Sequence, residues 1–293
     1  MLLIGESLNV ISTKIGRAFK ERDPLPIQEE AKKQKELGMD FIDINLGPAR
    51  KGGPELMEWV IKTVQEVVDD VPLALDTSNI EATEAGLAVC KGRPLINSIM
   101  CRTARYEKML PICAKYNARM IGLLWGPHGM PRDEHERAEL AVELVYAANE
   151  AGIANEDIFV DGIVTPVNVQ QDQVYSLLQF MPMVQDLGEG LRSTCGLSNV
   201  SNGSPDHLRP ILNQTYMVML EKCGMYSAIA DAYDKDLVDI AKGKRPDIVE
   251  IIGKVMDEET IDMSSISKEL KDYVKTARIL LKKALYSDSW LEL

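Results

Sequence analysis

Short apolar runs alternate with longer amphipathic stretches along most of the chain. Short runs rich in aliphatic and β-branched residues predict buried strands, and apolar residues spaced three and four positions apart predict helices packed on one face. Eight strands are predicted, beginning at 2–4, 41–44, 72–75, 95–96, 120–123, 158–160, 193–195 and 227–229. The helices predicted between them include 24–38, 54–69, 80–90, 103–117, 133–152, 170–186 and 206–223.

Eight successive βα units predict a parallel sheet covered by helices. An open doubly wound sheet would more often carry a glycine-rich phosphate loop after its first strand, and the sequence after Ile4 has none. We therefore expect residues 1–241 to form one α/β domain, a single (β/α)8 TIM barrel.

A different pattern begins at 242–246, where Lys-Gly-Lys-Arg-Pro interrupts the eighth helix. Beyond it, apolar residues recur at helical intervals in two groups, Ile248, Ile251, Ile252, Val255 and Leu270, Val274, Ile279, Leu280. This periodicity predicts a helical C-terminal extension over 242–293, with an insertion at about 242–273. We expect the insertion to affect partner docking or dimer packing, with coverage of the barrel flank as the alternative.

The composition argues against several classes of function for this protein. The hydrophobic fraction of 45% is typical of a globular protein, and a net charge of −12 argues against nucleic-acid binding. Five cysteines without a C-x-x-C pair and three scattered histidines predict neither disulfides nor a metal site. The chain opens without a leader and lacks an apolar run of about 20 residues, so we expect a cytoplasmic protein that does not enter membranes.

Polar residues follow seven of the eight predicted strands. Because a barrel's active site is built at the carboxyl ends of its strands, these residues are candidates for one site. They are Glu6, Asn9, Asp43, Asn45, Asp76, Asn79, Asn97, Ser98, Asp161, Ser198, Asn199 and Asp231. Any one of them could equally cap a helix. Together, carboxylates and amides suit a flat heterocycle that presents N–H, amino and carbonyl groups along one edge, which favours a pterin.

The sequence resembles the pterin-binding barrels, and most closely the methyltetrahydrofolate:corrinoid/iron–sulfur-protein methyltransferases of anaerobic one-carbon metabolism. The segments that carry the resemblance are 4–9 (IGESLN), 43–48 (DINLGP), 75–79 (LDTSN), 95–98 (LINS), 196–201 (GLSNVS), 209–210 (RP) and 227–231 (SAIAD). It extends from Met1 to about Ala241 and resumes near Lys275. The resemblance implies transfer of a methyl group between N5-methyltetrahydrofolate and the cobalt of a partner corrinoid protein, by a protein that is a homodimer.

The resemblance also implies individual roles. Asp76, Asn97 and Asp161 would bind the pterin edge, and Asn199 would reach the ring nitrogen that carries the methyl group. Further candidates for the pterin site are Gly196, Ser198, Arg209 and Asp231. Two departures stand out: Ser7 replaces an arginine usual in the family, and the stretch 202–207 differs and is longer.

A tertiary amine is a poor leaving group, so its nitrogen must gain positive charge as the methyl leaves. Asn199 could accept a hydrogen bond from the proton on that nitrogen, and Asp43 or Asp76 held protonated is the alternative acid. The corrinoid must come from a partner, because 133–138 (DEHERA) lacks the glycine of the corrinoid-binding D-x-H-x-x-G motif. We interpret 133–138 as a solvated turn that caps a helix.

Two other functions remain open. A dihydropteroate synthase shares the barrel and pterin pocket, but it requires a K-x-R-x-H pattern where this chain has 228–233 (AIADAY). A non-catalytic folate-binding subunit would keep the pocket without turnover. The direction of methyl transfer also stays open.

Overall fold

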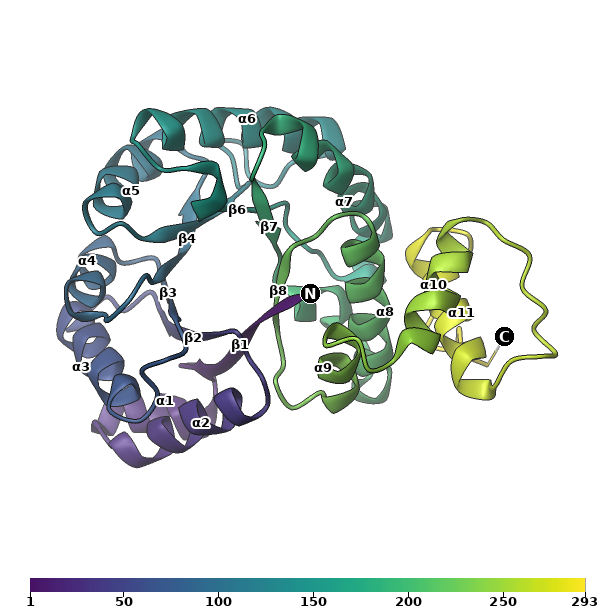
Figure 1. Cartoon of the computed structure of the whole chain (residues 1–293), viewed down its shortest axis with the longest axis horizontal. Coiled ribbons are helices and arrows are strands. Elements are labelled where there is room, and N and C mark those ends of the chain that lie inside the picture. The colour runs from purple at the N-terminus through teal and green to yellow at the C-terminus, as the bar shows by residue number, and fades with distance from the viewer. Residues whose placement is uncertain (293) are drawn as a thin grey trace.

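Eight parallel strands form a closed ring in the computed structural model, which describes residues 1–292 (Figure 1). The strands are β1 (Leu2–Asn9), β2 (Phe41–Gly47), β3 (Leu73–Thr77), β4 (Leu95–Met100), β5 (Arg119–Leu123), β6 (Ile158–Asp161), β7 (Arg192–Thr194) and β8 (Ser227–Ala230). Every strand predicted from the sequence is present, and the predicted (β/α)8 barrel is confirmed.

The ring closes between its shortest strands. Each strand pairs with its neighbours in the order β7-β6-β5-β4-β3-β2-β1-β8, and β8 meets β7 through a parallel bridge between Gly196 and Ile229. There the Ile229 amide donates to the Cys195 carbonyl (2.8 Å), and Ser227 Oγ donates to the Ser193 carbonyl (3.0 Å). These bonds join the two end strands of the sheet and bring the barrel to near closure.

Helices surround the ring. They are α1 (Thr13–Glu21), α2 (Pro24–Glu36), α3 (Gly53–Gln65), α4 (Ile80–Val89), α5 (Thr103–Lys115), α6 (Glu134–Glu150), α7 (Val167–Leu187), α8 (Arg209–Lys222) and α9 (Lys235–Ala241). Three 3₁₀ turns, η1 (Asn155–Asp157), η2 (Leu197–Ser201) and η3 (Asp206–Leu208), lie in loops. The sequence did not predict α1, and the helix predicted at 206–223 is divided into η3 and α8.

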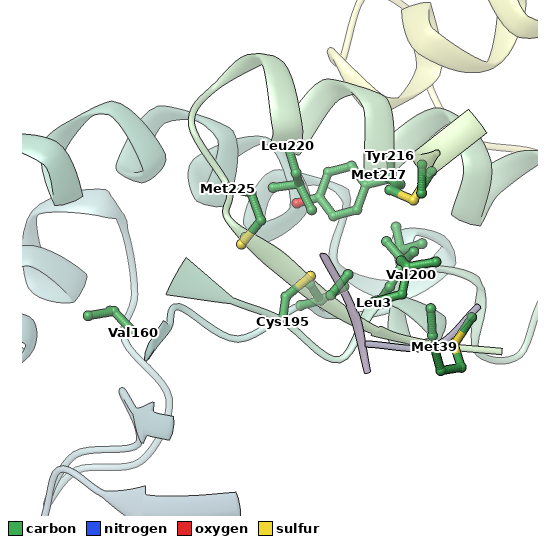
Figure 2. Packing of buried hydrophobic residues seen from close by; sticks show 14 of the residues in the cluster. Leu3, Met39, Val160, Cys195, Val200, Tyr216, Met217, Leu220 and Met225 are labelled. Atoms are coloured by element: carbon green, nitrogen blue, oxygen red, sulfur yellow. The ribbon is translucent and has the colours of Figure 1, made fainter. Parts of the chain in front are cut away.

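Two apolar layers fill the protein. Inside the ring, Ile4, Phe41, Ala74, Leu95, Ile121 and Phe159 form one buried cluster. The alternate strand residues face outward and pack under the helices. Figure 2 shows part of this outer layer, where Leu3 and Cys195 lie below Tyr216, Met217 and Leu220 of α8. The Tyr216 hydroxyl donates to the Val174 carbonyl (2.8 Å), so the only polar group of this buried side chain has a partner.

The predicted helical extension is also present. It contains α10 (Pro246–Met256) and α11 (Lys268–Leu280), which lie outside the ring beyond α8 (Figure 1). Ile248, Ile252 and Val274 are fully buried, and both helices pack on α8. Coverage of the barrel flank is therefore one role of these helices. Among the described residues, no helix is long and apolar enough to cross a membrane.

Candidate functional site

Strand register builds a polar layer directly above the apolar layer inside the barrel. Side chains alternate along a strand, so the residue two positions beyond an inner apolar residue also faces inward. Phe41 is followed by Asp43, Ala74 by Asp76, Leu95 by Asn97 and Phe159 by Asp161. The backbones are paired in register, Asp43 beside Ala74 and Asp76 beside Asn97. Parallel pairing thus collects these polar groups at the carboxyl end of the barrel.

These residues line a cavity of about 290 Å³. Its lining is Glu6, Asn9, Asp43, Asn45, Asp76, Asn97, Ser98, Leu123, Asp161, Ile163, Val164, Gly196, Asn199 and Ile229. Six of the residues with a predicted catalytic or pterin-binding role thus share this central cavity, namely Asp43, Asp76, Asn97, Asp161, Gly196 and Asn199. No lysine or arginine belongs to this lining, which disfavours a phosphate as the ligand.

Amide side chains hold two of the carboxylates. Asn97 Nδ2 donates to Asp43 Oδ1 (3.0 Å), and Asn45 Nδ2 donates to Asp76 Oδ2. Asn45 Oδ1 in turn accepts from the Gly47 amide (2.9 Å), which fixes the orientation of the Asn45 side chain. These bonds restrict the rotamers of the two aspartates and keep their remaining oxygens in fixed positions.

Asp161 is held by its own loop. Its Oδ1 accepts a hydrogen bond from the Ile163 amide (2.8 Å). Ile163 has a φ of 68°, in the left-handed region that a β-branched residue rarely adopts. Such a conformation persists only where surrounding contacts hold it, and here it directs the chain so that Ile163 and Val164 wall the cavity.

The carboxyl groups of the cavity are electrostatically unusual. Burial raises the pKa of Asp43 well above its ordinary value, and the nearby Asp76 carboxylate raises it further. Burial also raises the pKa of Asp76 to about 7 and that of Asp161 to about 6. At neutral pH, part of this set is protonated, so the site can both donate and accept hydrogen bonds.

Asn199 reaches the cavity from η2, the 3₁₀ turn that follows β7. Its backbone amide donates to the Gly196 carbonyl (3.2 Å). A Cβ at position 196 would lie 2.9 Å from Asn199 Nδ2, closer than side-chain carbons normally approach. Glycine at 196 therefore lets the Asn199 side chain pack against the backbone at the cavity wall.

The other three residues with a predicted role in pterin binding line a second, adjoining cavity. Ser198, Arg209 and Asp231 lie in this cavity of about 500 Å³, and Glu6 lines both cavities. Ser198 Oγ donates to Glu6 Oε1 (2.6 Å), and burial raises the pKa of Glu6. Over residues 1–292, no cluster of three or more His, Cys, Asp or Glu side chains is suited to hold a metal ion.

Other cavity residues had no individual role predicted for them. Glu6, Asn9, Asn45 and Ser98 were candidates on one signal only, a polar residue at a strand end. The apolar wall residues Leu123, Ile163, Val164 and Ile229 had none, because an inward aliphatic side chain is also the commonest core residue. Asn79, by contrast, caps α4 by accepting from the Ala82 amide (3.1 Å).

The interpretation of 133–138 as a solvated turn is wrong for one residue, Arg137. Asp133 does cap α6, accepting from the Glu136 amide (2.9 Å). Arg137, however, is fully buried, and its guanidinium donates to the Gly162 carbonyl (2.7 Å), Ser176 Oγ (2.8 Å) and Gln173 Oε1 (2.8 Å). It therefore braces the loop immediately after Asp161 from outside the barrel.

Known proteins share this architecture. In solved structures, dihydropteroate synthase of Xanthomonas albilineans with 4-aminobenzoic acid superposes with a TM-score of 0.63 at 19% identity, covering 83% of this chain and 93% of its own. The enzyme of Thermus thermophilus gives 0.61 at 19% identity, over 82% and 93%. At these identities the similarity establishes the fold.

Sequence comparison goes further. The chain is 28% identical over 243 residues to a methylcorrinoid:tetrahydrofolate methyltransferase of Eubacterium limosum, covering 81% of this chain and 88% of the relative. It is 25% identical to methionine synthase of Mycobacterium leprae, spanning 79% of this chain and only 20% of that enzyme. The profile of the family described as "Pterin binding enzyme" matches residues 5–229, from β1 to β8. The chain therefore belongs to the pterin-binding enzyme family, as its sequence motifs predicted.

Proposed function

We propose that this protein transfers a methyl group between N5-methyltetrahydrofolate and the cobalt of a corrinoid carried by a partner protein. The observation that carries the proposal is the central cavity, where Asp76, Asn97, Asp161 and Asn199 meet without a basic residue in the lining. The name of the Eubacterium limosum relative, a methylcorrinoid:tetrahydrofolate methyltransferase, describes the same pair of substrates.

Binding would use the polar layer. A pterin presents a ring N–H and an exocyclic amine side by side, and one carboxylate accepts both in parallel. Asp161 and Asp76 are the acceptors in this proposal, while Asn97 offers an amide that is already bonded to Asp43. Burial and the Asp76 carboxylate raise the pKa of Asp43, which favours a protonated Asp43 carboxyl that can donate to a ring nitrogen or carbonyl of the pterin.

In the methyl transfer from folate, the bond between N5 and the methyl carbon breaks and the carbon bonds to Co(I). N5 keeps the electron pair of the broken bond and takes up one proton from solvent, so tetrahydrofolate and a methyl-Co(III) corrinoid result. Asn199 would accept a hydrogen bond from that proton as charge develops on N5, without ionising itself. In the reverse direction, the same contact would stabilise the departing proton.

A second candidate in the same family, dihydropteroate synthesis, has less support. Its structural relatives share the fold, but the K-x-R-x-H pattern that we associate with that reaction is absent from β8 and the residues after it (AIADAY). The central cavity also offers no cation for a pyrophosphate. A non-catalytic folate-binding protein would have the same pocket, and only the lack of turnover would distinguish it from the proposed enzyme.

The test is a turnover assay on the purified protein. Methyltetrahydrofolate is mixed with free cob(I)alamin, and the loss of Co(I) absorbance is followed; the reverse reaction uses methylcobalamin and tetrahydrofolate. We expect turnover in at least one direction, and its loss in Asn199→Ala. Folate binding by calorimetry with no turnover in either direction, using free cobalamin or a corrinoid protein, would instead favour a binding subunit.

A further inference from the structure

The C-terminal segment returns to the barrel and bonds to the loop that carries Asn199. The phenolic oxygen of Tyr286 lies 2.8 Å from Ser204 Oγ and 2.8 Å from Asp288 Oδ1. A phenol has one proton, so Tyr286 donates to the carboxylate and accepts from the Ser204 hydroxyl. Ser204 is 7% exposed and belongs to the segment 202–207 that departs from the family pattern.

The segment that presents Tyr286 is itself fixed. Gln171 of α7 donates from Nε2 to the Ile279 and Ala284 carbonyls (2.6 and 2.8 Å), and its Oε1 accepts from the Tyr286 amide (3.3 Å). The ring of Tyr286 packs on Trp290, with centroids 5.3 Å apart, and Trp290 is 3% exposed. Gln171 thus holds the backbone of Tyr286 and Trp290 packs on its ring, where Tyr286 contacts the loop at 202–207.

From Ser204, hydrogen bonds continue toward the proposed site. The Ser204 amide donates to the Ser201 carbonyl (3.0 Å), and Ser201 Oγ donates to the Ser198 carbonyl (3.2 Å). Ser201 Oγ also accepts from Arg209 Nε (3.3 Å). Ser198 directly precedes Asn199 and bonds to Glu6. The turn that presents Asn199 is therefore tied to the extension through side chains outside the cavity.

The extension is also linked to the loop after β8 through a side chain of α8. Tyr273 of α11 donates its hydroxyl proton to Gln214 Oε1 of α8 (2.6 Å), and Gln214 Nε2 donates to Asp234 Oδ1 (2.8 Å). Asp234 caps α9 and lines the adjoining cavity. The extension thus bonds directly to one loop at the carboxyl end of the barrel and reaches the next loop through Gln214.

We propose that Tyr286 is a positioning residue, which sets the conformation of the turn 198–204 through Ser204 and so places Asn199 for methyl transfer. This inference rests on the proposed function for its kinetic consequence, but its structural part does not. A misplacement of about 1 Å in a catalytic site can slow a reaction roughly 100-fold. A smaller shift of Asn199 should therefore lower the rate severalfold, whereas ground-state binding by Asp76 and Asp161 should change little.

The test compares Tyr286→Phe, Ser204→Ala and the double variant. We expect each to lower kcat for transfer to free cob(I)alamin about three- to tenfold, with the Kd for methyltetrahydrofolate changed less than about twofold. The double variant should be no slower than the worse single variant, because both remove the same bond. Amide hydrogens of 198–204 should exchange faster in all three.

Ser267→Ala is the matched control. It removes the hydroxyl that caps α11 by accepting from the Leu270 amide (3.2 Å), a bond inside the extension that involves neither Tyr286 nor Trp290. We expect it to lower the melting temperature without altering exchange at 198–204 or kcat. The proposal is overturned if Tyr286→Phe and Ser204→Ala leave both exchange and kcat unchanged, or if Ser267→Ala reproduces their effects.

Failure of the proposed function and failure of the role inferred for Tyr286 would give different results. If the wild-type protein shows no methyl transfer, the proposed function is wrong, and the exchange data alone decide whether Tyr286 holds the turn. If Tyr286→Phe does not fold, Ser204→Ala still removes the bond from the loop side and leaves the extension intact.

Discussion

Asn97 on β4 donates to Asp43 on β2 across the intervening strand β3, with 3.0 Å between Asn97 Nδ2 and Asp43 Oδ1. Asp76 lies on that intervening strand, at a register position next to Asn97. Three neighbouring strands therefore share one polar network above the apolar layer of the barrel. Such a network is arranged before a ligand binds, so less ordering is required when it does.

Removal of the Asp161 carboxylate should weaken folate binding. The wild-type protein should bind methyltetrahydrofolate with no metal or corrinoid added, because all proposed pterin contacts are its own side chains. Asp161→Ala would leave buried pterin donors without an acceptor, at a cost of about 1–3 kcal/mol, or roughly 5- to 150-fold in Kd. Asp76→Ala should act in the same direction. Isothermal titration calorimetry measures both.

Asp186→Ala provides the control for those variants, since Asp186 is exposed on α7. It should bind folate as the wild type does. Unchanged affinity in both Asp161→Ala and Asp76→Ala would refute the proposed pocket, and binding that appears only after zinc is added would refute metal-free recognition.

Asp76 should make stability depend on pH. Burial raises its pKa from 3.8 to about 7, so the folded protein holds a proton that the unfolded chain has released. Its contribution to stability is present below about pH 4 and is lost as the pH rises to about 7. Asp76→Asn removes this loss and should be more stable than wild type at pH 8, by roughly 1–3 kcal/mol.

Urea unfolding at pH 5 and pH 8 measures this effect as a difference between the two proteins. The gap in unfolding free energy between Asp76→Asn and wild type should grow with pH. A gap that is constant or shrinks would mean that Asp76 is ionised in the folded state at neutral pH.

Asn199→Ala should reduce turnover much more than ground-state affinity. The proposed contact strengthens as charge develops on N5, so its loss acts on the transition state. Loss of one such contact lowers kcat roughly 100-fold, and we expect Kd for methyltetrahydrofolate to change far less. Steady-state assays with free cob(I)alamin and calorimetry separate the two. Weaker binding with normal kcat would assign Asn199 to ground-state recognition instead.

The fold and the central cavity could be predicted because period-two strands leave a clear pattern. An inward apolar residue followed two positions later by a polar one predicts both the inner core and the polar layer above it, as in the pairs Phe41 and Asp43 and Phe159 and Asp161. The helix α1 was missed although Ile15, Ala18 and Phe19 have helical spacing, because it lies within the connection from β1 to β2.

Other features had no local signal. The burial of Arg137 depends on Gly162, Gln173 and Ser176, which are 25 to 39 positions away. Most of the residues around it in the sequence are charged, so they indicate a solvated surface. The bond between Tyr286 and Ser204 joins positions 82 apart. Pairings of this kind follow from how helices pack around the ring, which no short sequence window contains.

Stability should depend on the buried side of α10 and not on its exposed side. Ile252 is fully buried against the barrel flank, while Val249 on the same helix is 38% exposed. Ile252→Ala should lower the unfolding free energy by about 2–5 kcal/mol, because it leaves a cavity under α10. Val249→Ala should change it by less than about 0.5 kcal/mol. Chemical denaturation measures both.

Function should respond differently from stability in these variants. Folded Ile252→Ala should keep wild-type folate affinity and transfer to free cob(I)alamin, because the cavity residues identified above all precede α10. Transfer to a corrinoid protein is the informative readout for the insertion at 242–273. Its selective loss in Val249→Asp, with free-cobalamin turnover retained, would assign the exposed side of α10 to partner docking. Equal turnover with both acceptors would limit α10 to packing, and loss of folate binding in a folded variant would refute our placement of the pocket.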